Sequence, residues 1–277
     1  MAMMAGAALC FSGMGVCYRL ALEEGLPTPA APFARGIFTL LILIPWIARQ
    51  GIAAAFLTRR PWLMTGRCAA GLVSFQSWML ALVLLPLADA VAIAQARPLW
   101  AIPLAALFLH ERVRRDRVLA ALVGFCGVLI IAQPGGALSW GVPAAVLAGV
   151  GGAMVFITIK LLSTTEPPMR VIAWYALSSL VIWGPVCAWL WVTPSWGAVA
   201  LLLLGSLWAL GGDWLASNAA RRAEAGLLSP MEYIQIPAGA LFGWLVFAEL
   251  PGEWLPMGVA LMLAATLYLA RAARRQA

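Results

Sequence analysis

The chain alternates between long apolar stretches and short polar loops. A helix rises about 1.5 Å per residue and the hydrocarbon core of a bilayer is about 30 Å thick, so a spanning helix needs about twenty mainly apolar residues. The pattern predicts ten such spans, near residues 2–22, 31–48, 61–84, 88–109, 117–133, 139–162, 168–192, 196–219, 226–247 and 253–270. Unbroken apolar runs such as 118–132 lack the alternation of a barrel strand. We therefore expect an all-α polytopic membrane protein.

The composition agrees with this reading and excludes a soluble globular domain. Hydrophobic residues make up 64% of the 277 residues and charged residues 10%, whereas soluble domains average about 45–50% apolar and about 25% charged residues.

The positions of the basic residues predict the orientation. Fifteen of the eighteen lie around the even-numbered loops or in the tail: Arg49, Arg59, Arg60, Arg67, Arg112, Arg114, Arg115, Arg117, Lys160, Arg170, Arg221, Arg222, Arg271, Arg274 and Arg275. The odd-numbered loops hold Arg19 and four glutamates, and Arg35 and Arg97 are left for the membrane interior. The positive-inside rule predicts an inner-membrane protein with both termini cytoplasmic. A pI near 9.7 with this loop distribution indicates membrane insertion and no nucleic-acid partner.

An internal repeat divides the chain. Residues 107–111 close the fourth span as residues 245–249 close the ninth, an offset of 138, and the first and sixth spans end alike at an offset of 141. At the offset of 138, Ala101 and Ala105 fall on Gly239 and Gly243, small residues that let helices approach closely. We predict two five-helix repeats, 1–136 and 137–277. Because five is odd, the second repeat is inverted, as in many secondary transporters.

Two stretches carry a resemblance to a known family. The first is residues 88–100 with Pro103, residues 111–113, Gly124 and Gly127; the second runs from 225–230 to 243–249. With them the chain resembles the EamA type of the drug/metabolite transporter superfamily, which has ten helices as five plus five. The resemblance implies transport of amino acids, vitamins, nucleoside-like metabolites or drugs. The YddG-like amino-acid exporters of this family imply a central cavity lined by helices of both halves.

Arg97, near the middle of the fourth span, is the first candidate binding residue. An arginine at a helix centre costs about 2.5–3.5 kcal/mol on insertion scales, so it should face the bundle interior. Its planar fork could bind a substrate carboxylate. Alternatively, it could belong to a structural ion pair or snorkel from lower in the helix. The adjacent Pro98 lacks an N–H donor and should make the helix irregular there.

Acidic and amide residues in two later spans are further candidates. Glu232 shares a helical stripe with Gln235, Gly239 and Gly243, and Asp213 lies on a narrow polar face of the eighth span. Either acid could accept a coupled proton, bind a substrate amine or neutralise Arg97. We expect Arg97 to hold the anionic end of the substrate and Glu232 its cationic end or a proton.

Aromatic rings deep in the spans could form a wall against an organic substrate. The candidates are Trp78 with the adjacent Ser77, Trp100, Trp208 and Tyr233. Helix packing is the alternative role for each ring.

The chain lacks the motifs of an enzyme, a metal site or a nucleotide-binding domain, so we expect no cofactor and a gradient as the energy source. We predict a carrier for a small-molecule metabolite, an amino acid or related zwitterion, with export favoured by the resemblance. A carrier for another metabolite such as a vitamin, an intramembrane enzyme, and a binding or channel-like subunit are the alternatives.

Overall fold

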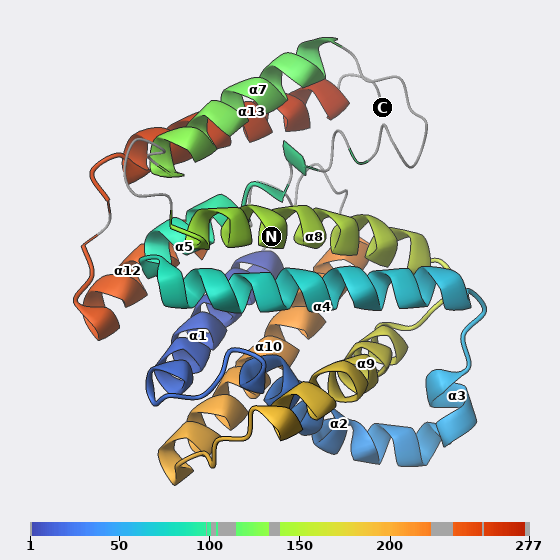
Figure 1. Cartoon of the computed structure of the whole chain (residues 1–277). Helices are drawn as coiled ribbons and strands as arrows, with labels where there is room; N and C mark the ends of the chain where they lie inside the picture. The colour runs from blue at the N-terminus through green and yellow to red at the C-terminus, as the bar shows by residue number, and fades with distance from the viewer. Residues whose placement is uncertain are drawn as a thin grey trace.

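The computed structural model describes residues 2–97, 99–100, 104, 115–132, 139–222, 235–250 and 252–274, and within these ranges the regular elements are all helices. They are α1 (Ala2–Glu23), α2 (Ala30–Gln50), α3 (Ile52–Phe56), α4 (Pro61–Leu84), α5 (Leu87–Ala94), α7 (Arg115–Ala132), α8 (Gly141–Leu162), α9 (Pro168–Trp189), α10 (Trp196–Arg222), α12 (Gln235–Phe247) and α13 (Leu255–Arg274) (Figure 1). Six of these helices, α1, α2, α4, α8, α9 and α10, are long and apolar enough to cross a membrane. The chain is an all-α polytopic membrane protein.

Local sequence chemistry explains where several helices begin and end. Pro61 and Pro168 stand in the first turns of α4 and α9, where a missing N–H costs no hydrogen bond. Gly51 follows α2 with a φ of 83°, a left-handed conformation that glycine adopts without strain.

The fourth span is interrupted where Pro98 predicts an irregularity. Helix α5 ends at Ala94 and the chain turns at Gln95 and Ala96. A proline at 98 has no N–H for the carbonyl four residues earlier, which belongs to Ala94. Helix α8 approaches this carbonyl through Gly149, where a Cβ would lie 3.1 Å from the Ala94 oxygen.

The helices pack in pairs. When each helix is replaced by the helix at the same place in the other half of the chain, the same set of pairs results. Helix α1 packs along α10, and α4 packs along α8; α2 packs against α9, and α7 against α13. Some of the smaller contacts follow the same rule, since α5 with α8 corresponds to α12 with α1. Two equivalent five-helix repeats would produce this pattern. The boundary between 136 and 137 stays a prediction.

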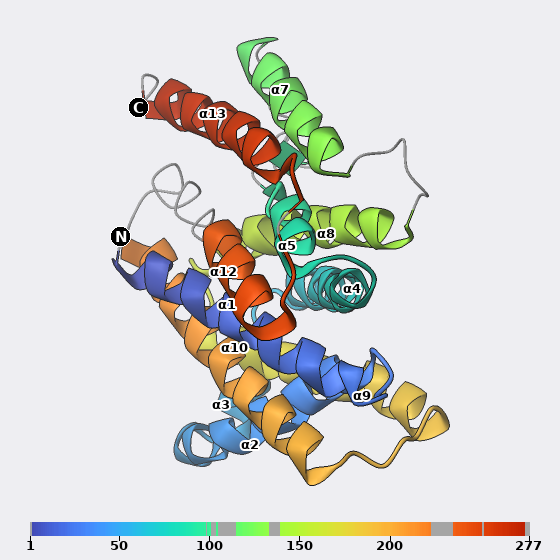
Figure 2. The same ribbon diagram turned by 90° about the vertical axis from the view of Figure 1, so that its left-hand side faces the viewer.

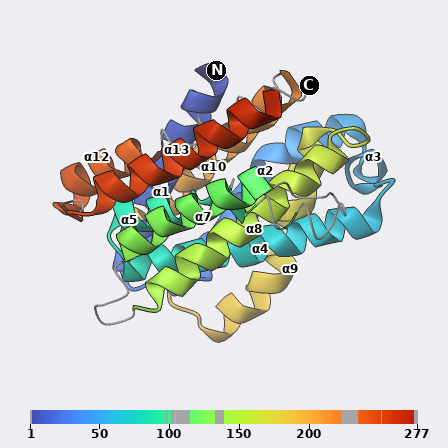
Figure 3. The ribbon, with the colours of Figure 1, turned by 90° about the horizontal axis from the view of Figure 1, so that it is seen from above.

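The pair α7 and α13 forms a separate layer beside the other helices (Figures 1 and 2). Two glycines bring the backbones of this pair together: a Cβ on Gly127 would lie 2.6 Å from the Gly258 oxygen, and the reverse distance is also 2.6 Å. Seen from above, the start of α1 and the end of α13 lie at the same edge of the molecule (Figure 3).

Polar side chains tie the loops together at both ends of the bundle. Glu166, between α8 and α9, accepts hydrogen bonds from Thr58 Oγ1 (2.7 Å) and the Arg59 N–H (2.8 Å) and pairs with Arg170. Arg170 also donates to the Ala54 carbonyl. These contacts join the second loop to the sixth.

At the other end, Glu249 pairs with Arg19 and accepts the Leu87 N–H at 2.9 Å. Arg19 also lies over the Phe247 ring, 4.3 Å from its centroid. These residues border the first, third and ninth loops. Loops predicted on the same side of the membrane are therefore the ones that touch.

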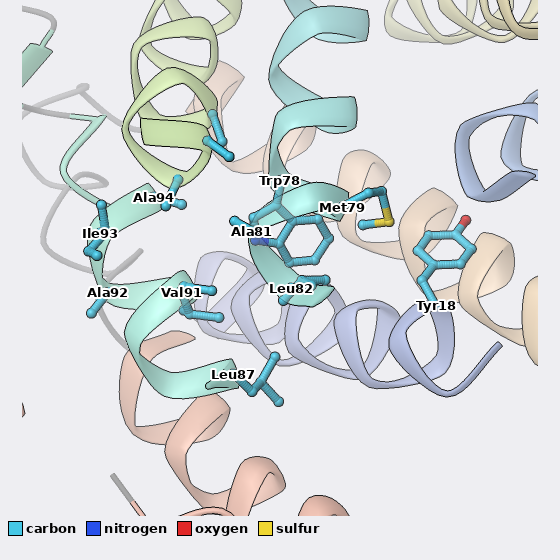
Figure 4. Packing of buried hydrophobic residues seen from close by; sticks show 14 of the residues in the cluster. Tyr18, Trp78, Met79, Ala81, Leu82, Leu87, Val91, Ala92, Ile93 and Ala94 are labelled. Atoms are coloured by element: carbon cyan, nitrogen blue, oxygen red, sulfur yellow. The ribbon is translucent and has the colours of Figure 1, made fainter. Parts of the chain in front are cut away.

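The main apolar core is built mainly by side chains of α1, α4 and α5, with contributions from α8, α10 and α12 (Figure 4). Tyr18, Met79 and Leu82 are fully buried in it. Glycines of α12 pack on α5: a Cβ on Gly239 would lie 3.3 Å from Val91 Cγ2, and one on Gly243 would lie 3.6 Å from Leu87 Cβ. The ninth span thus contacts the beginning of the fourth. Ala101 and Ala105, the positions that the repeat relates to Gly239 and Gly243, lie outside the described residues.

Candidate functional site

Arg35 and Asp213 form an ion pair inside the bundle. Arg35 projects from α2 and is 8% exposed; Asp213 comes from α10, and its side chain is 26% exposed. The guanidinium also lies over two rings, 4.8 Å from the centroid of Phe75 and 5.1 Å from that of Tyr175. An arginine inside a bundle needs such compensation because removal from water is costly. The pair joins a helix of the first half to one of the second.

A second arginine, Arg67, lies beside the same tyrosine. It projects from the second turn of α4, is 7% exposed, and its guanidinium carbon lies 4.8 Å from the centroid of Tyr175. Its Nε and Nη1 atoms are buried and have no hydrogen-bond partner among the described residues. Two guanidinium groups therefore flank one aromatic ring, and one of them retains free donors.

Aromatic rings continue from this point into the core. Phe75 makes an edge contact with Tyr18, with centroids 5.8 Å apart, and a tilted contact with Trp78 at 6.0 Å. The Tyr18 hydroxyl shares a 3.0 Å hydrogen bond with Ser206 of α10. Figure 4 shows Tyr18 and Trp78 among the packed side chains of the apolar core. We call Arg35, Arg67, Tyr175 and Asp213, with the rings Tyr18, Phe75 and Trp78, the central cluster.

Arg97 and Trp100 lie in another part of the bundle, against α8 and α7. A Cβ on Gly152 would lie 2.7 Å from Arg97 Nε, so the side chain crosses the α8 backbone at this glycine. Trp100 makes an edge contact with Phe125, with centroids 4.3 Å apart. Arg97 Nε and Trp100 Nε1 are buried and lack a hydrogen-bond partner within the described part of the chain.

Gln95 and Gln235 meet between α5 and α12. The Gln95 side-chain amide donates a hydrogen bond to the Gln235 side-chain oxygen, and both residues are buried. They are 140 residues apart, two more than the offset of 138 that relates the fourth and ninth spans. Residues at nearly equivalent positions of two repeats meet only close to the axis that relates the repeats.

The structure thus divides the predicted site into two groups. Asp213 pairs with Arg35, and not with Arg97 as one of our alternatives had it. Trp78 belongs to the central cluster and Ser77 is buried beside it, whereas Trp208 packs on Gly13 of α1 and is 40% exposed. Glu232 and Tyr233 lie outside the described residues.

Sequence reasoning did not single out Arg35, Arg67 or Tyr175 as site residues. Arg67 was counted with the second loop, but the structure buries it inside α4. Its position in the sequence could have indicated this, because Arg67 lies six residues inside the span that is predicted to begin at residue 61. A long side chain at this depth can snorkel to the membrane surface or turn inward, and hydropathy does not distinguish the two.

Comparison with known proteins places the chain among membrane transporters. Residues 1–133 match the family described as the EamA-like transporter family. A riboflavin transporter of Rhizobium johnstonii is 30% identical over 96% of this chain and 88% of the relative. An S-adenosylmethionine uptake transporter of Rickettsia felis is 27% identical over 86% of this chain and 81% of the relative. A pseudopaline exporter of Pseudomonas aeruginosa is 30% identical over 91% and 90%.

A solved crystal structure shares the fold. It is 19% identical, superposes with a TM-score of 0.64, and the match covers 98% of each chain.

Proposed function

Because this chain belongs to the EamA-like transporter family, we propose that it is a secondary transporter that moves a small organic metabolite across the inner membrane by alternating access. The central cluster carries this proposal. It brings a buried ion pair, a second guanidinium and several rings together from α1, α2, α4, α9 and α10, which belong to both halves of the sequence. A site between halves that rock against each other can open to one side at a time.

The first substrate candidate is a flat heterocyclic metabolite of the riboflavin type. The rings of Tyr18, Phe75, Trp78 and Tyr175 are buried in this conformation, and ring faces that open as the halves move would let a planar ring system stack on them. The arginines offer donors for ring carbonyl oxygens. The similarity to riboflavin transporters over nearly the whole chain supports this choice.

The second candidate is an amino acid or a related zwitterion. Arg35 and Asp213 place a cation and a carboxylate side by side, which are the partners that a zwitterion needs. The family resemblance favours export of such a compound. The relatives named for S-adenosylmethionine uptake and pseudopaline export support both directions of movement, so transport should be measured both ways.

The inverted repeat supplies the mechanism. The exchange pattern of helix pairs and the contact between Gln95 and Gln235 support two equivalent halves at 1–136 and 137–277. If the second half is inverted, each movement that opens one side has a counterpart that opens the other. Coupling of this movement to a proton stays a prediction.

The test is transport by the purified protein alone in liposomes. Entry of riboflavin can be followed by its fluorescence, and exchange of labelled amino acids by counterflow, each with and without an imposed pH gradient. Vectorial movement of either substrate that saturates supports the proposal. Chemical conversion without movement would indicate an enzyme, and no activity without an added protein would indicate a dependent subunit.

A further inference from the structure

Arg67 is distinguished from the other buried arginine of the central cluster by its free donors. Arg35 has a carboxylate partner in Asp213, whereas Nε and Nη1 of Arg67 are buried without a hydrogen-bond partner in the described ranges. Buried guanidinium donors are normally paired because removing them from water without a partner is costly. A missing partner for a buried guanidinium inside a transporter indicates a place for a ligand.

The charges of the central cluster also indicate a place for a ligand. Its members carry two guanidinium groups and one carboxylate, and that carboxylate binds Arg35. The Tyr175 ring compensates part of the charge of Arg67 through its π-face, but a ring face does not replace an oxygen acceptor. The cluster therefore has one positive charge in excess.

Helix α4 is shaped to hold the guanidinium in this position. Gly71 follows Arg67 by one turn, and a Cβ on it would lie 2.9 Å from Tyr175 Cε2 and 3.1 Å from Arg67 Nη1. The absence of a side chain lets the ring and the guanidinium lie directly on the helix backbone. On the same helix Gly66 has no atom within 4 Å of such a Cβ, so it provides a matched control.

We propose that Arg67 is the substrate-recognising residue of the central cluster, and that its free N–H groups bind an oxygen-acceptor group of the transported metabolite. The assignment rests on the proposed transport function. Two sources offer this chemistry, a carboxylate and the carbonyl oxygens of a heterocyclic ring. A guanidinium fork matches either better than the point charge of a lysine does.

The test measures transport into proteoliposomes with three probes: riboflavin, L-tryptophan and L-tryptophanamide. The variants are Arg67→Lys and Arg67→Gln, with Arg49→Lys at the exposed end of α2 as the control. We expect both Arg67 variants to raise KM by about tenfold or more, the loss typical of a charged hydrogen bond, with a smaller change in kcat. The control should keep both constants.

The three probes separate the two sources. A carboxylate partner predicts that the wild-type protein prefers L-tryptophan over its amide and that Arg67→Gln removes this preference. A ring-carbonyl partner predicts transport of riboflavin, but not of L-tryptophan, with the same rise in KM.

Gly71→Ala tests the geometry while Arg67 itself is kept. The added methyl should displace the ring and the guanidinium and raise KM, while Gly66→Ala should behave like the wild type. A KM within twofold of the wild-type value in all Arg67 and Gly71 variants would overturn the assignment and leave the transport function standing. A wild-type protein that moves none of the probes would contradict the proposed substrate classes, and the assignment would fall with them.

Discussion

At the scale of single residues, the main feature of this bundle is that two arginines point into its interior and away from the lipid. Arg35 reaches a carboxylate and two rings. Arg67 reaches a ring, and its Nε and Nη1 have no hydrogen-bond partner among the described residues. A cation in a medium of low polarity is stabilised by what it touches, because water no longer screens it. Substitutions of the partners of these arginines should therefore lower the stability of the protein more than substitutions of loop arginines do.

The pair of Arg35 and Asp213 gives a first prediction. Arg35→Met strands the carboxylate, so the free energy of unfolding should fall toward the lower end of the about 3–5 kcal/mol typical of broken buried pairs, because Asp213 keeps some exposure. Arg35→Met with Asp213→Leu removes both charges and should recover most of the loss. Thermal unfolding in detergent measures this, with Arg49→Met as the exposed control. Losses that simply add in the double variant would show that the two charges are not coupled.

At the scale of elements, glycines stand at the crossings where helices come closest. Gly239 and Gly243 lie against Val91 and Leu87, and Gly127 lies against Gly258. Lipid chains are as apolar as leucine, so helices associate through close packing and hydrogen bonds more than through the hydrophobic effect. A larger side chain at any of these small residues should therefore disturb the packing of the bundle.

The crossing of α12 with α5 gives a second prediction. Gly239→Leu introduces a side chain where Val91 Cγ2 already lies 3.3 Å from a bare Cβ. Overpacking of this kind costs about 1–3 kcal/mol, so detergent stability and transport should both fall. Gly66→Leu, which enters open space, should be mild. Wild-type expression, stability and transport in Gly239→Leu would show that this crossing tolerates volume.

The loop contacts of Glu166 give a third prediction, on pH. Burial of this carboxyl opposes ionisation, but hydrogen bonds from Thr58, Arg170 and the Arg59 N–H outweigh it and lower its pKa. A lowered pKa means that the folded state favours the charged form. The stabilisation is then present above the ordinary glutamate pKa of about 4.3 and is lost as the pH falls through the lowered value.

Glu166→Gln should accordingly be less stable than the wild type at neutral pH, by about 1.5–3 kcal/mol for the loss of a charged hydrogen bond. The difference should shrink as the pH drops below the ordinary glutamate range. Unfolding curves at several pH values measure it, and Glu253→Gln, at an exposed position, is the control. An unchanged difference at low pH would mean that the charge of Glu166 contributes little.

At the scale of the whole molecule, contacts between loops agree with alternating spans. The second loop touches the sixth through Glu166, and the loops bordered by Arg19 and Glu249 meet at the other end. Such contacts fix which loops share a side. The absolute orientation rests on the distribution of basic residues.

The fourth prediction is therefore topological. Reporter fusions after Arg115 and after Arg275 should be cytoplasmic, and a fusion after Gly136 should be external. A cytoplasmic reporter at Gly136 would contradict the inversion of the second half and the mechanism that depends on it. Arg275 and Gly136 lie outside the described residues, so the reporters are needed to show on which side of the membrane they lie.

The sequence by itself determined the class of this protein. Span length, apolar runs and the resemblance of residues 88–100 and 225–249 identified an all-helical transporter, because a bilayer imposes its thickness on every helix separately. The break after Ala94 also followed from a local cause, the missing N–H of Pro98. Each of these properties depends on one segment at a time.

The partners of the buried charges were decided only by the tertiary structure. Arg35 meets Asp213 across 178 residues of sequence, and Arg67 meets Tyr175 across the contact of α4 and α9. Hydropathy measures how apolar a segment is, but not which face of a helix meets which neighbour. That choice depends on where small residues such as Gly71 allow close approach. The sequence therefore shows where the charges lie along the chain. Which charges and rings become partners is decided only when the helices pack.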